Sequence, residues 1–314
     1  MNIVFCSDNN FLKPTLVSLN SIMASCNKNN FFNFFVLTPG LSKKNEKTLK
    51  NFSKNKKCKI ELITVDDTIL KSCPIKQGDH VSLSAYYRIL LPLIISNDVK
   101  KILYLDGDIL CVSELQDFYN TDLSEKSCAV VHDERNNDSE IYQRLEYKKE
   151  NGYFNSGVML INLDYWRSHD IQNKTLKYIS ENKEKCLWHD QDALNYILNG
   201  TVEWADFRYN LTQGFLFEKK QLKIDSIYWK KIDSAIKNPC LIHYCSAYKP
   251  WHIECNSPFK KLWRENYKKT FAKNCRLIFK NKGKERIKWC IKLVFNTLRI
   301  KNYADFRKSI IKEI

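Results

Sequence analysis

Short apolar runs that alternate with segments of helical periodicity constrain this fold more than any other feature of the sequence. The strand-like runs lie at residues 3–6, 34–37, 59–65, 102–105, 128–131, 158–163 and 240–243. Between the early runs, residues 14–24 repeat apolar side chains at helical spacing, and residues 42–52 begin with a serine cap. Strands that alternate with helices predict an α/β fold, in which helices cover both faces of a mostly parallel mixed sheet.

The segment Asp106-Gly107-Asp108 directly follows the apolar run at 102–105. In an extended chain residues i and i+2 point to the same side, so both carboxylates can reach one ion. We expect Gly107 to let a bulky ligand approach the backbone. Carboxylate oxygens suit Mn²⁺ or Mg²⁺, which complete their coordination with water and phosphate oxygens. The segment therefore predicts a divalent-cation site for a diphosphate, while a surface turn is the alternative for these three residues taken alone.

Further polar segments accompany this motif along the chain. They lie at residues 5–10, 84–89, 154–158, 188–195 and 243–251. In open α/β sheets, ligands bind beyond the carboxyl ends of the strands, which is where Asp8, Asp106 and Asp108 fall. The sequence therefore predicts one site at this edge of the sheet.

Length and composition limit the class of protein. With 314 residues, of which 44% are apolar, the chain can bury the core of one large domain with an appendage. No apolar stretch reaches the roughly 18 residues that span a bilayer, and a strand-like run begins at residue 3, so we expect no signal peptide. Twelve cysteines without a Cys-x-x-Cys pair predict reduced, buried thiols of a cytoplasmic protein rather than disulfides or a zinc site.

The net charge of +16 is concentrated at the end of the chain. Residues 259–314 carry 18 Lys and Arg against four Asp and Glu, whereas residues 1–258 carry 33 against 31. Apolar residues from Ile287 to Leu298 recur at helical spacing among these cations, which predicts a basic amphipathic helix on an anionic membrane surface. A helix packed on the body is one alternative. Nucleic-acid binding by the tail is another, but no recognised module supports it, so we expect no nucleic-acid partner.

In their order and spacing, the segments from residue 1 to about 255 resemble the retaining glycosyltransferases of family eight, in particular bacterial lipooligosaccharide and lipopolysaccharide α-galactosyltransferases. The resemblance implies a single nucleotide-diphospho-sugar-binding, Rossmann-like domain of the GT-A type at residues 1–258, followed by the helical tail at 259–314. It implies transfer of galactose or glucose from a UDP-sugar to a glycolipid or oligosaccharide acceptor, with Mn²⁺ or Mg²⁺ as the cofactor. A protein-directed, glycogenin-like enzyme is the alternative within the same fold.

The resemblance also implies roles for individual residues. The metal ligands are Asp106, Asp108 and His243, and Asn155 and Gln191 flank the reacting carbon. The donor-binding residues are Ser7, Asp8, Asn10, Val81, Arg88, Asp106, Gly107, Asp108, Asn155, Asp190, Gln191, Ser246 and Lys249. The family has glycine and then proline where this chain has Ser246 and Ala247. Loop position alone suggests the acceptor-side residues His80, Asp133 and Thr212.

Simpler structural roles exist for some of these carboxylates. Asp8 follows a strand, where an aspartate commonly forms an Asx turn. Asp190 and Asp192 lie at the start of an expected helix, where acids interact favourably with the positive end of the helix dipole.

The chemistry that the resemblance implies has one main electrostatic demand. Departure of UDP builds negative charge, which a metal ion stabilises as a Lewis acid beside Lys249. Retention requires either a nucleophile beneath the sugar or attack by the acceptor from the leaving-group side. Because the Gln191 amide is a poor nucleophile, we favour same-face attack, and Asp192 is the candidate nucleophile for double displacement.

Overall fold

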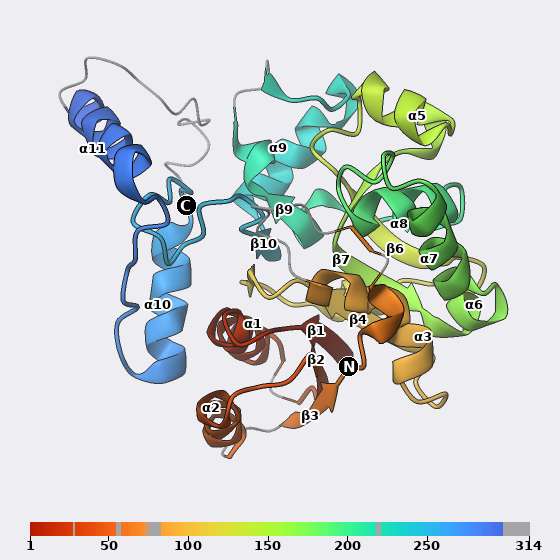
Figure 1. Cartoon of the computed structure of the whole chain (residues 1–314), viewed down its shortest axis with the longest axis horizontal. Helices are drawn as coiled ribbons and strands as arrows, with labels where there is room; N and C mark the ends of the chain where they lie inside the picture. Colours follow the sequence, from red (N-terminus) through yellow and green to blue (C-terminus); the bar gives the residue numbers. More distant parts are fainter. Residues whose placement is uncertain (28, 55–57, 72, 75–82, 218–220, 298–314) are drawn as a thin grey trace.

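The computed structural model describes residues 1–297 apart from residues 28, 55–57, 72, 75–82 and 218–220. A large sheet with the strand order β3-β2-β1-β4-β7-β6-β8 lies at the centre (Figure 1). Its strands are β1 (Asn2–Cys6), β2 (Phe32–Thr38), β3 (Cys58–Thr64), β4 (Lys101–Leu105), β6 (Cys128–His132), β7 (Phe154–Asn162) and β8 (Val202–Trp204). Only β7 runs antiparallel to its neighbours, which confirms the predicted mixed, mostly parallel sheet.

A second, smaller sheet lies beside the first and has the order β5-β10-β9. Its strands are β5 (Ile109–Cys111), β9 (Leu211–Thr212) and β10 (Leu241–His243). β10 pairs antiparallel with β5 and parallel with β9. The predicted strand at residues 240–243 is therefore present, but it belongs to this smaller sheet.

The described ranges contain helices where the periodicity predicts them, at residues 14–24 and 42–52, and further helices elsewhere. They are α1 (Leu12–Ser25), α2 (Lys43–Ser53), α3 (Leu91–Ile94), α4 (Gln116–Tyr119), α5 (Ser139–Leu145), α6 (Leu163–Ser168), α7 (Ile171–Glu181), α8 (Asp190–Leu198), α9 (Trp229–Lys237), α10 (Lys260–Phe271) and α11 (Gly283–Thr297). Ser42 caps α2 as predicted, because its side chain accepts a hydrogen bond from the backbone N–H of Asn45. The polar segment at 84–89 lies in a 3₁₀ helix, η2 (Leu83–Leu90).

Side-chain alternation along the strands builds one core on each face of the large sheet. Ile3 and Phe5 of β1 pack with Leu16 of α1, while Val4 between them packs on the opposite side with Tyr86 of η2. All of these side chains are buried. Each fully buried apolar side chain contributes about 1.5–3 kcal/mol, so the two cores hold the sheet between its helical layers.

The segment after residue 258 packs on the body. Trp263 and Tyr267 of α10 are buried in a third core beside the small sheet, and Tyr244 donates a hydrogen bond to the Phe259 carbonyl at 2.9 Å. Farther on, the Ile253 N–H donates to the Ile278 carbonyl at 2.9 Å. The body therefore continues to about residue 281, and the boundary expected at residue 258 lies too early.

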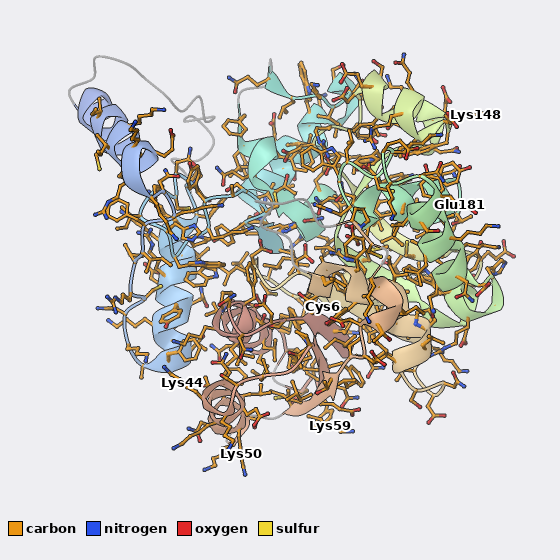
Figure 2. The ribbon with its side chains drawn as sticks, in the orientation of Figure 1. Cys6, Lys44, Lys50, Lys59, Lys148 and Glu181 are labelled. Carbon is orange, nitrogen blue, oxygen red and sulfur yellow. The ribbon has the colours of Figure 1, made fainter. Side chains whose placement is uncertain are left out.

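Charged side chains cover the outside of the molecule. Lys44 and Lys50 on α2 and Lys59 on β3 lie at the periphery of the view, whereas Cys6 lies near its middle (Figure 2). The cysteines are all free thiols, and most of them are buried. Within the described ranges, no helix is both long enough and apolar enough to cross a bilayer.

Candidate active site

The two sheets meet at a cluster of three possible metal ligands. Asp106 and Asp108 follow the carboxyl end of β4, and His243 closes β10 in register with Ile109 of β5. The His243 Nε2 lies 3.4 Å from an Asp108 oxygen and 3.7 Å from an Asp106 oxygen. One ligand atom of each residue can be chosen so that all three lie within 4.8 Å of one another. The structure thus brings together the three residues that the resemblance implied.

A buried asparagine orients the His243 ring. Asn210 accepts the Nδ1 hydrogen of His243 at 3.0 Å, which leaves the Nε2 lone pair directed at the carboxylates. The Asn210 amide also donates to Asn155 Oδ1 at 3.0 Å, which fixes its own orientation. Sequence reasoning missed Asn210, because no motif surrounds it.

The donor set fits a divalent cation. Two carboxylates and one imidazole provide hard oxygen ligands with one nitrogen, which Mn²⁺ or Mg²⁺ accepts. Burial would raise the pKa of Asp108, but the Lys249 ammonium at 2.5 Å and His243 hold it below its usual range. A Cβ at Gly157 would fall 2.3 Å from His243 Cε1 and 2.7 Å from Asp106 Oδ2, so only glycine leaves the cluster its space.

Gly107 lines the cavity and also packs closely against α1. A Cβ there would fall 2.7 Å from Thr15 Oγ1 and 3.4 Å from the Phe11 ring. Close packing against α1 therefore requires the glycine.

An arginine–aspartate pair lies next to the cluster. Arg88 is buried, and its Nε lies 2.8 Å from an oxygen of Asp190, the first residue of α8. A second guanidinium nitrogen lies 3.4 Å from Asp106. The Nε hydrogen itself donates to the Ala85 carbonyl, so the contact with Asp190 is chiefly electrostatic. Burial raises the pKa of Asp190 to about 6, against the opposing charge of Arg88.

The Gln191 amide is held at both ends. Its Nε2 donates to Asp133 Oδ2 at 3.3 Å and to the Tyr153 hydroxyl at 3.1 Å, and its Oε1 accepts from the Ser156 N–H at 3.0 Å. Asn155 also donates to Asp133 Oδ2, at 3.3 Å. Asp133, Asn155 and Gln191 therefore form one hydrogen-bonded group on the cavity wall.

Asp192 and Thr212 do not lie at the cavity. Asp192 is fully buried and accepts hydrogen bonds from Arg144, the Tyr153 hydroxyl and the Trp188 N–H. These partners hold its carboxylate away from the cavity, so this geometry does not favour its expected role as a nucleophile. Thr212 is also buried, where its hydroxyl donates to Glu134 at 2.6 Å, so it is not placed to contact an acceptor.

The remaining expected donor residues differ in their positions. Asp8 and Asn10 line the cavity, and Asp8 Oδ1 accepts the N–H groups of Asn10 and Phe11, which is the Asx turn considered above. Ser246 also lines the cavity. Ser7 does not line the cavity, because it is buried and accepts a hydrogen bond from Thr15 at 3.1 Å. His80 and Val81 lie outside the described residues.

The metal-ligand cluster, the Arg88–Asp190 pair and the group that contains Gln191 all face one large cavity of about 1210 Å³. Sequence reasoning missed several of its residues, among them Glu134 and Arg135. The Arg135 guanidinium lies 3.8 Å from the centre of the Trp188 ring system, a cation–π distance. Glu134 and Arg135 follow the carboxyl end of β6, and that position was the signal that could have identified them.

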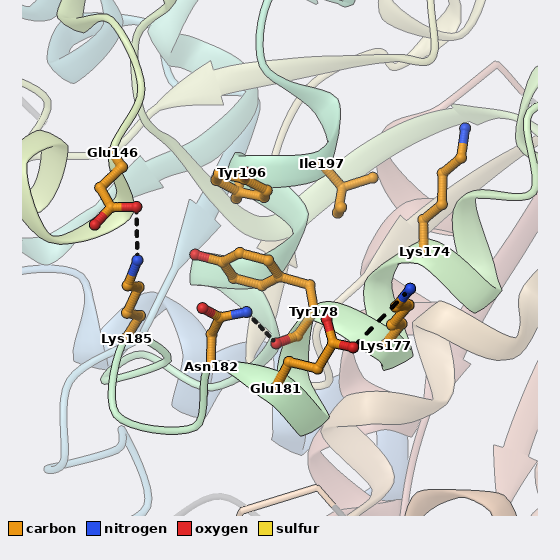
Figure 3. Close-up of a pocket in the computed structure, with 9 residues that line it drawn as sticks. All are labelled: Glu146, Lys174, Lys177, Tyr178, Glu181, Asn182, Lys185, Tyr196 and Ile197. Carbon is orange, nitrogen blue, oxygen red and sulfur yellow. Dashed lines mark hydrogen bonds and ion pairs between the residues drawn. The ribbon is translucent and has the colours of Figure 1, made fainter.

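A smaller cavity of about 300 Å³ lies between α7 and α8 (Figure 3). Tyr178 and Tyr196 stack there with their ring centroids 4.1 Å apart, and Glu146 pairs with Lys185 at 2.7 Å. It shares no lining residue with the large cavity, so it is separate from the site.

A mixed α/β sheet whose strand ends place a carboxylate–imidazole cluster in a large cavity agrees with a glycosyltransferase of the GT-A type, and the comparisons show that class. The chain belongs to glycosyl transferase family 8, whose model matches residues 2–255.

Known proteins agree with this assignment. The chain is 30% identical to a putative glycosyltransferase of Haemophilus influenzae, over 82% of this chain and 74% of that protein. It is 29% identical to a lipopolysaccharide 1,2-glucosyltransferase of Escherichia coli, over 85% of this chain and 77% of that protein. The solved structure of the galactosyltransferase LgtC with donor and acceptor sugar analogues superposes with a TM-score of 0.76, at 26% identity, over 92% of this chain and all of that one.

Proposed function

We propose that this enzyme transfers galactose or glucose from a UDP-sugar to a lipooligosaccharide, lipopolysaccharide or other surface glycan, with retention at the anomeric carbon. The observation that carries the proposal is the cluster of Asp106, Asp108 and His243 beside Lys249 in one large cavity. The names of relatives that act on lipopolysaccharide support the acceptor class.

The donor diphosphate is proposed to lie between the ligand cluster and Lys249. A Mn²⁺ or Mg²⁺ ion held by Asp106, Asp108 and His243 would supply Lewis-acid stabilisation of the UDP leaving group. Lys249 keeps its ammonium in place through hydrogen bonds to Asp108 and to the Tyr244 carbonyl at 2.9 Å. Asp8 and Asn10, which line the same cavity, are the proposed contacts of the nucleoside.

The sugar is proposed to lie against Arg88, Asp190, Asn155 and Gln191. The two ends of the Gln191 amide are already hydrogen-bonded, so the amide suits a fixed dipole beneath the ring better than a nucleophile. The acceptor hydroxyl then attacks the anomeric carbon from the face that UDP leaves, and the departing phosphate oxygen takes its proton. Asp133 is a proposed acceptor contact, because it lines the cavity and holds Gln191 and Asn155.

The basic C-terminal helix is the proposed membrane contact of a cytoplasmic enzyme at the inner face of the cell membrane. On α11, Ile287 and Ile291 are exposed one turn apart, between cations such as Lys284 and Lys288. Binding to phosphatidylserine vesicles should fall at least tenfold in a chain lacking residues 282–314 and in the Ile287→Ser/Ile291→Ser variant. Unchanged vesicle binding by both variants would remove this part of the proposal.

The donor and metal are tested directly by an assay of UDP-sugar turnover. UDP-galactose, UDP-glucose and UDP-N-acetylglucosamine are compared with Mn²⁺, Mg²⁺ and EDTA, with truncated lipopolysaccharide as acceptor. We expect UDP release with one of the two hexoses that depends on the metal, and an α-linked product by NMR. A turnover rate that EDTA leaves unchanged, or an inverted product, would contradict the proposal.

A further inference from the structure

We propose that Lys280 is a further donor-binding residue, a second ammonium group that contacts the diphosphate of the nucleotide sugar. This inference rests on the proposed function and deepens it. Lys280 lies beyond residues 2–255, which the family model matches, so it belongs to a part of this chain that the family pattern does not cover.

Lys280 lines the same cavity as the metal-ligand cluster and Lys249. Its ammonium donates a hydrogen bond to the Ala247 carbonyl at 2.9 Å and lies 5.8 Å from the centre of the Tyr248 ring. Ala247 is two residues from Lys249, so both ammonium groups are held by one short loop. Burial, and then the charge of Lys249, lower the pKa of Lys280, which agrees with two cations on one wall.

The backbone around Lys280 is anchored independently of its side chain. The buried carboxylate of Glu254 accepts the N–H of Lys280 at 3.0 and 3.1 Å and the N–H of Asn281 at 2.8 Å. A bridge pairs Ile278 with His252, and the Ile278 N–H donates to the Trp251 carbonyl at 3.1 Å. These bonds return the chain from α10 to the rim of the cavity. Glu254 is therefore a positioning residue for Lys280.

Charge balance gives this second cation a function. The two carboxylates of Asp106 and Asp108 neutralise a divalent ion, and Asp190 balances the charge of Arg88. Among the described residues at the cluster, this leaves Lys249 as the excess positive charge. A nucleotide-sugar diphosphate carries two negative charges, so Lys249 alone leaves one of them uncompensated. Lys280, on the same wall, supplies the missing charge. A charged partner of this kind matters most in a cavity from which water is partly excluded.

The test compares ligand binding by the full chain and two variants. Lys280→Met removes the charge and keeps the length of the side chain, and Lys282→Met, at an exposed lysine two residues away, is the matched control. Calorimetric titrations with UDP, UMP and uridine are made at saturating Mn²⁺. We expect Lys280→Met to raise the Kd for UDP about tenfold, the size of a charged hydrogen bond, and to leave uridine binding unchanged. Lys282→Met should match the wild type within twofold.

A third variant tests the anchor. Glu254→Gln weakens the acceptor of the two N–H groups, so UDP binding should fall severalfold, and adding Lys280→Met to it should cost less than Lys280→Met alone. Wild-type UDP affinity in Lys280→Met, or an equal loss for UDP and uridine, would overturn the inference. If the wild type itself fails to bind UDP, the proposed function falls as well, so the two failures are distinguishable.

Discussion

Asn210 holds the His243 imidazole by a 3.0 Å hydrogen bond from Nδ1, with its own carboxamide fully buried. This bond selects the tautomer in which Nε2 is free to bind a cation. Partners of this kind usually change metal affinity 10- to 100-fold when they are removed. Asn210 therefore positions a candidate metal ligand, although it is not itself a member of the ligand cluster.

Asn210→Ala is accordingly expected to raise the Mn²⁺ dissociation constant by about 10- to 100-fold, because His243 loses its orientation. Electron paramagnetic resonance of free Mn²⁺ measures this constant without turnover. Asn173→Ala, at an exposed asparagine of α7, is the control and should stay near the wild-type value. Wild-type affinity in a folded Asn210→Ala variant would contradict the assigned orientation.

Gln191→Ala should keep appreciable turnover, within about 100-fold of the wild-type kcat, because the amide contributes a dipole and no covalent bond. Asp106→Ala should lower kcat by about 1000-fold or more, because the leaving group loses its electrostatic stabilisation. Both values are measured at saturating donor and metal. A Gln191→Ala enzyme as inactive as Asp106→Ala, with intact UDP binding, would instead point to a covalent intermediate.

Asp192→Asn should reduce stability and leave chemistry nearly intact. Asp192 is fully buried and paired with Arg144 at 2.8 Å, and breaking one side of a buried pair typically costs about 3–5 kcal/mol. Chemical denaturation should show this loss, while the folded fraction retains kcat within a few fold. Adding Arg144→Met should recover part of the stability. Abolished turnover at unchanged stability would return Asp192 to the nucleophile role.

His132 gives the fold a defined acid sensitivity. Burial, against the hydrogen bond of Asn136, lowers the pKa of His132 to about 4, and its ring stacks on Trp204 at 3.7 Å. In the unfolded chain a histidine takes up a proton with a pKa of about 6.5, whereas the buried ring of the folded protein takes it up only at lower pH. The free energy of unfolding is therefore highest above pH 6.5 and decreases as the pH falls toward 4. This one histidine changes the free energy of unfolding by at most about 1.4 kcal/mol per pH unit.

His132→Phe should flatten the slope between pH 6.5 and 4, as measured by urea unfolding at several pH values. His169→Phe, at an exposed histidine, is the control and should leave the slope unchanged. An identical slope in His132→Phe and the wild type would show that another group causes the sensitivity.

Local rules were enough to predict the sheet and the carboxylate part of the site. Asp106 and Asp108 follow a buried strand, and their two-residue spacing places both on one side. The mixed sheet followed from strands that alternate with helices. In each case the signal lies within a few consecutive residues, so it does not depend on distant pairing.

Residues whose position depends on long-range packing were missed or misplaced. Asn210 reaches His243 only because the segment before β9 lies against β10, a pairing between residues about 30 apart that no local pattern announces. Asp192 is one residue from Gln191, but successive helical side chains diverge by about 100°, so it points toward Arg144 instead of the cavity. In α10, the four-residue spacing of Trp263 and Tyr267 did carry a packing signal, which the high local charge obscured.

The cation ligands come from both sheets, with the two aspartates at the end of β4 and the histidine on β10. Cation affinity should therefore depend on how firmly the β5–β10 ladder joins the two parts of the molecule. If the β5–β10 pairing breaks first on warming, the bound cation would be released while the large sheet still gives its full circular dichroism signal. Heat inactivation of this enzyme should then begin below its melting temperature, and added cation should delay it.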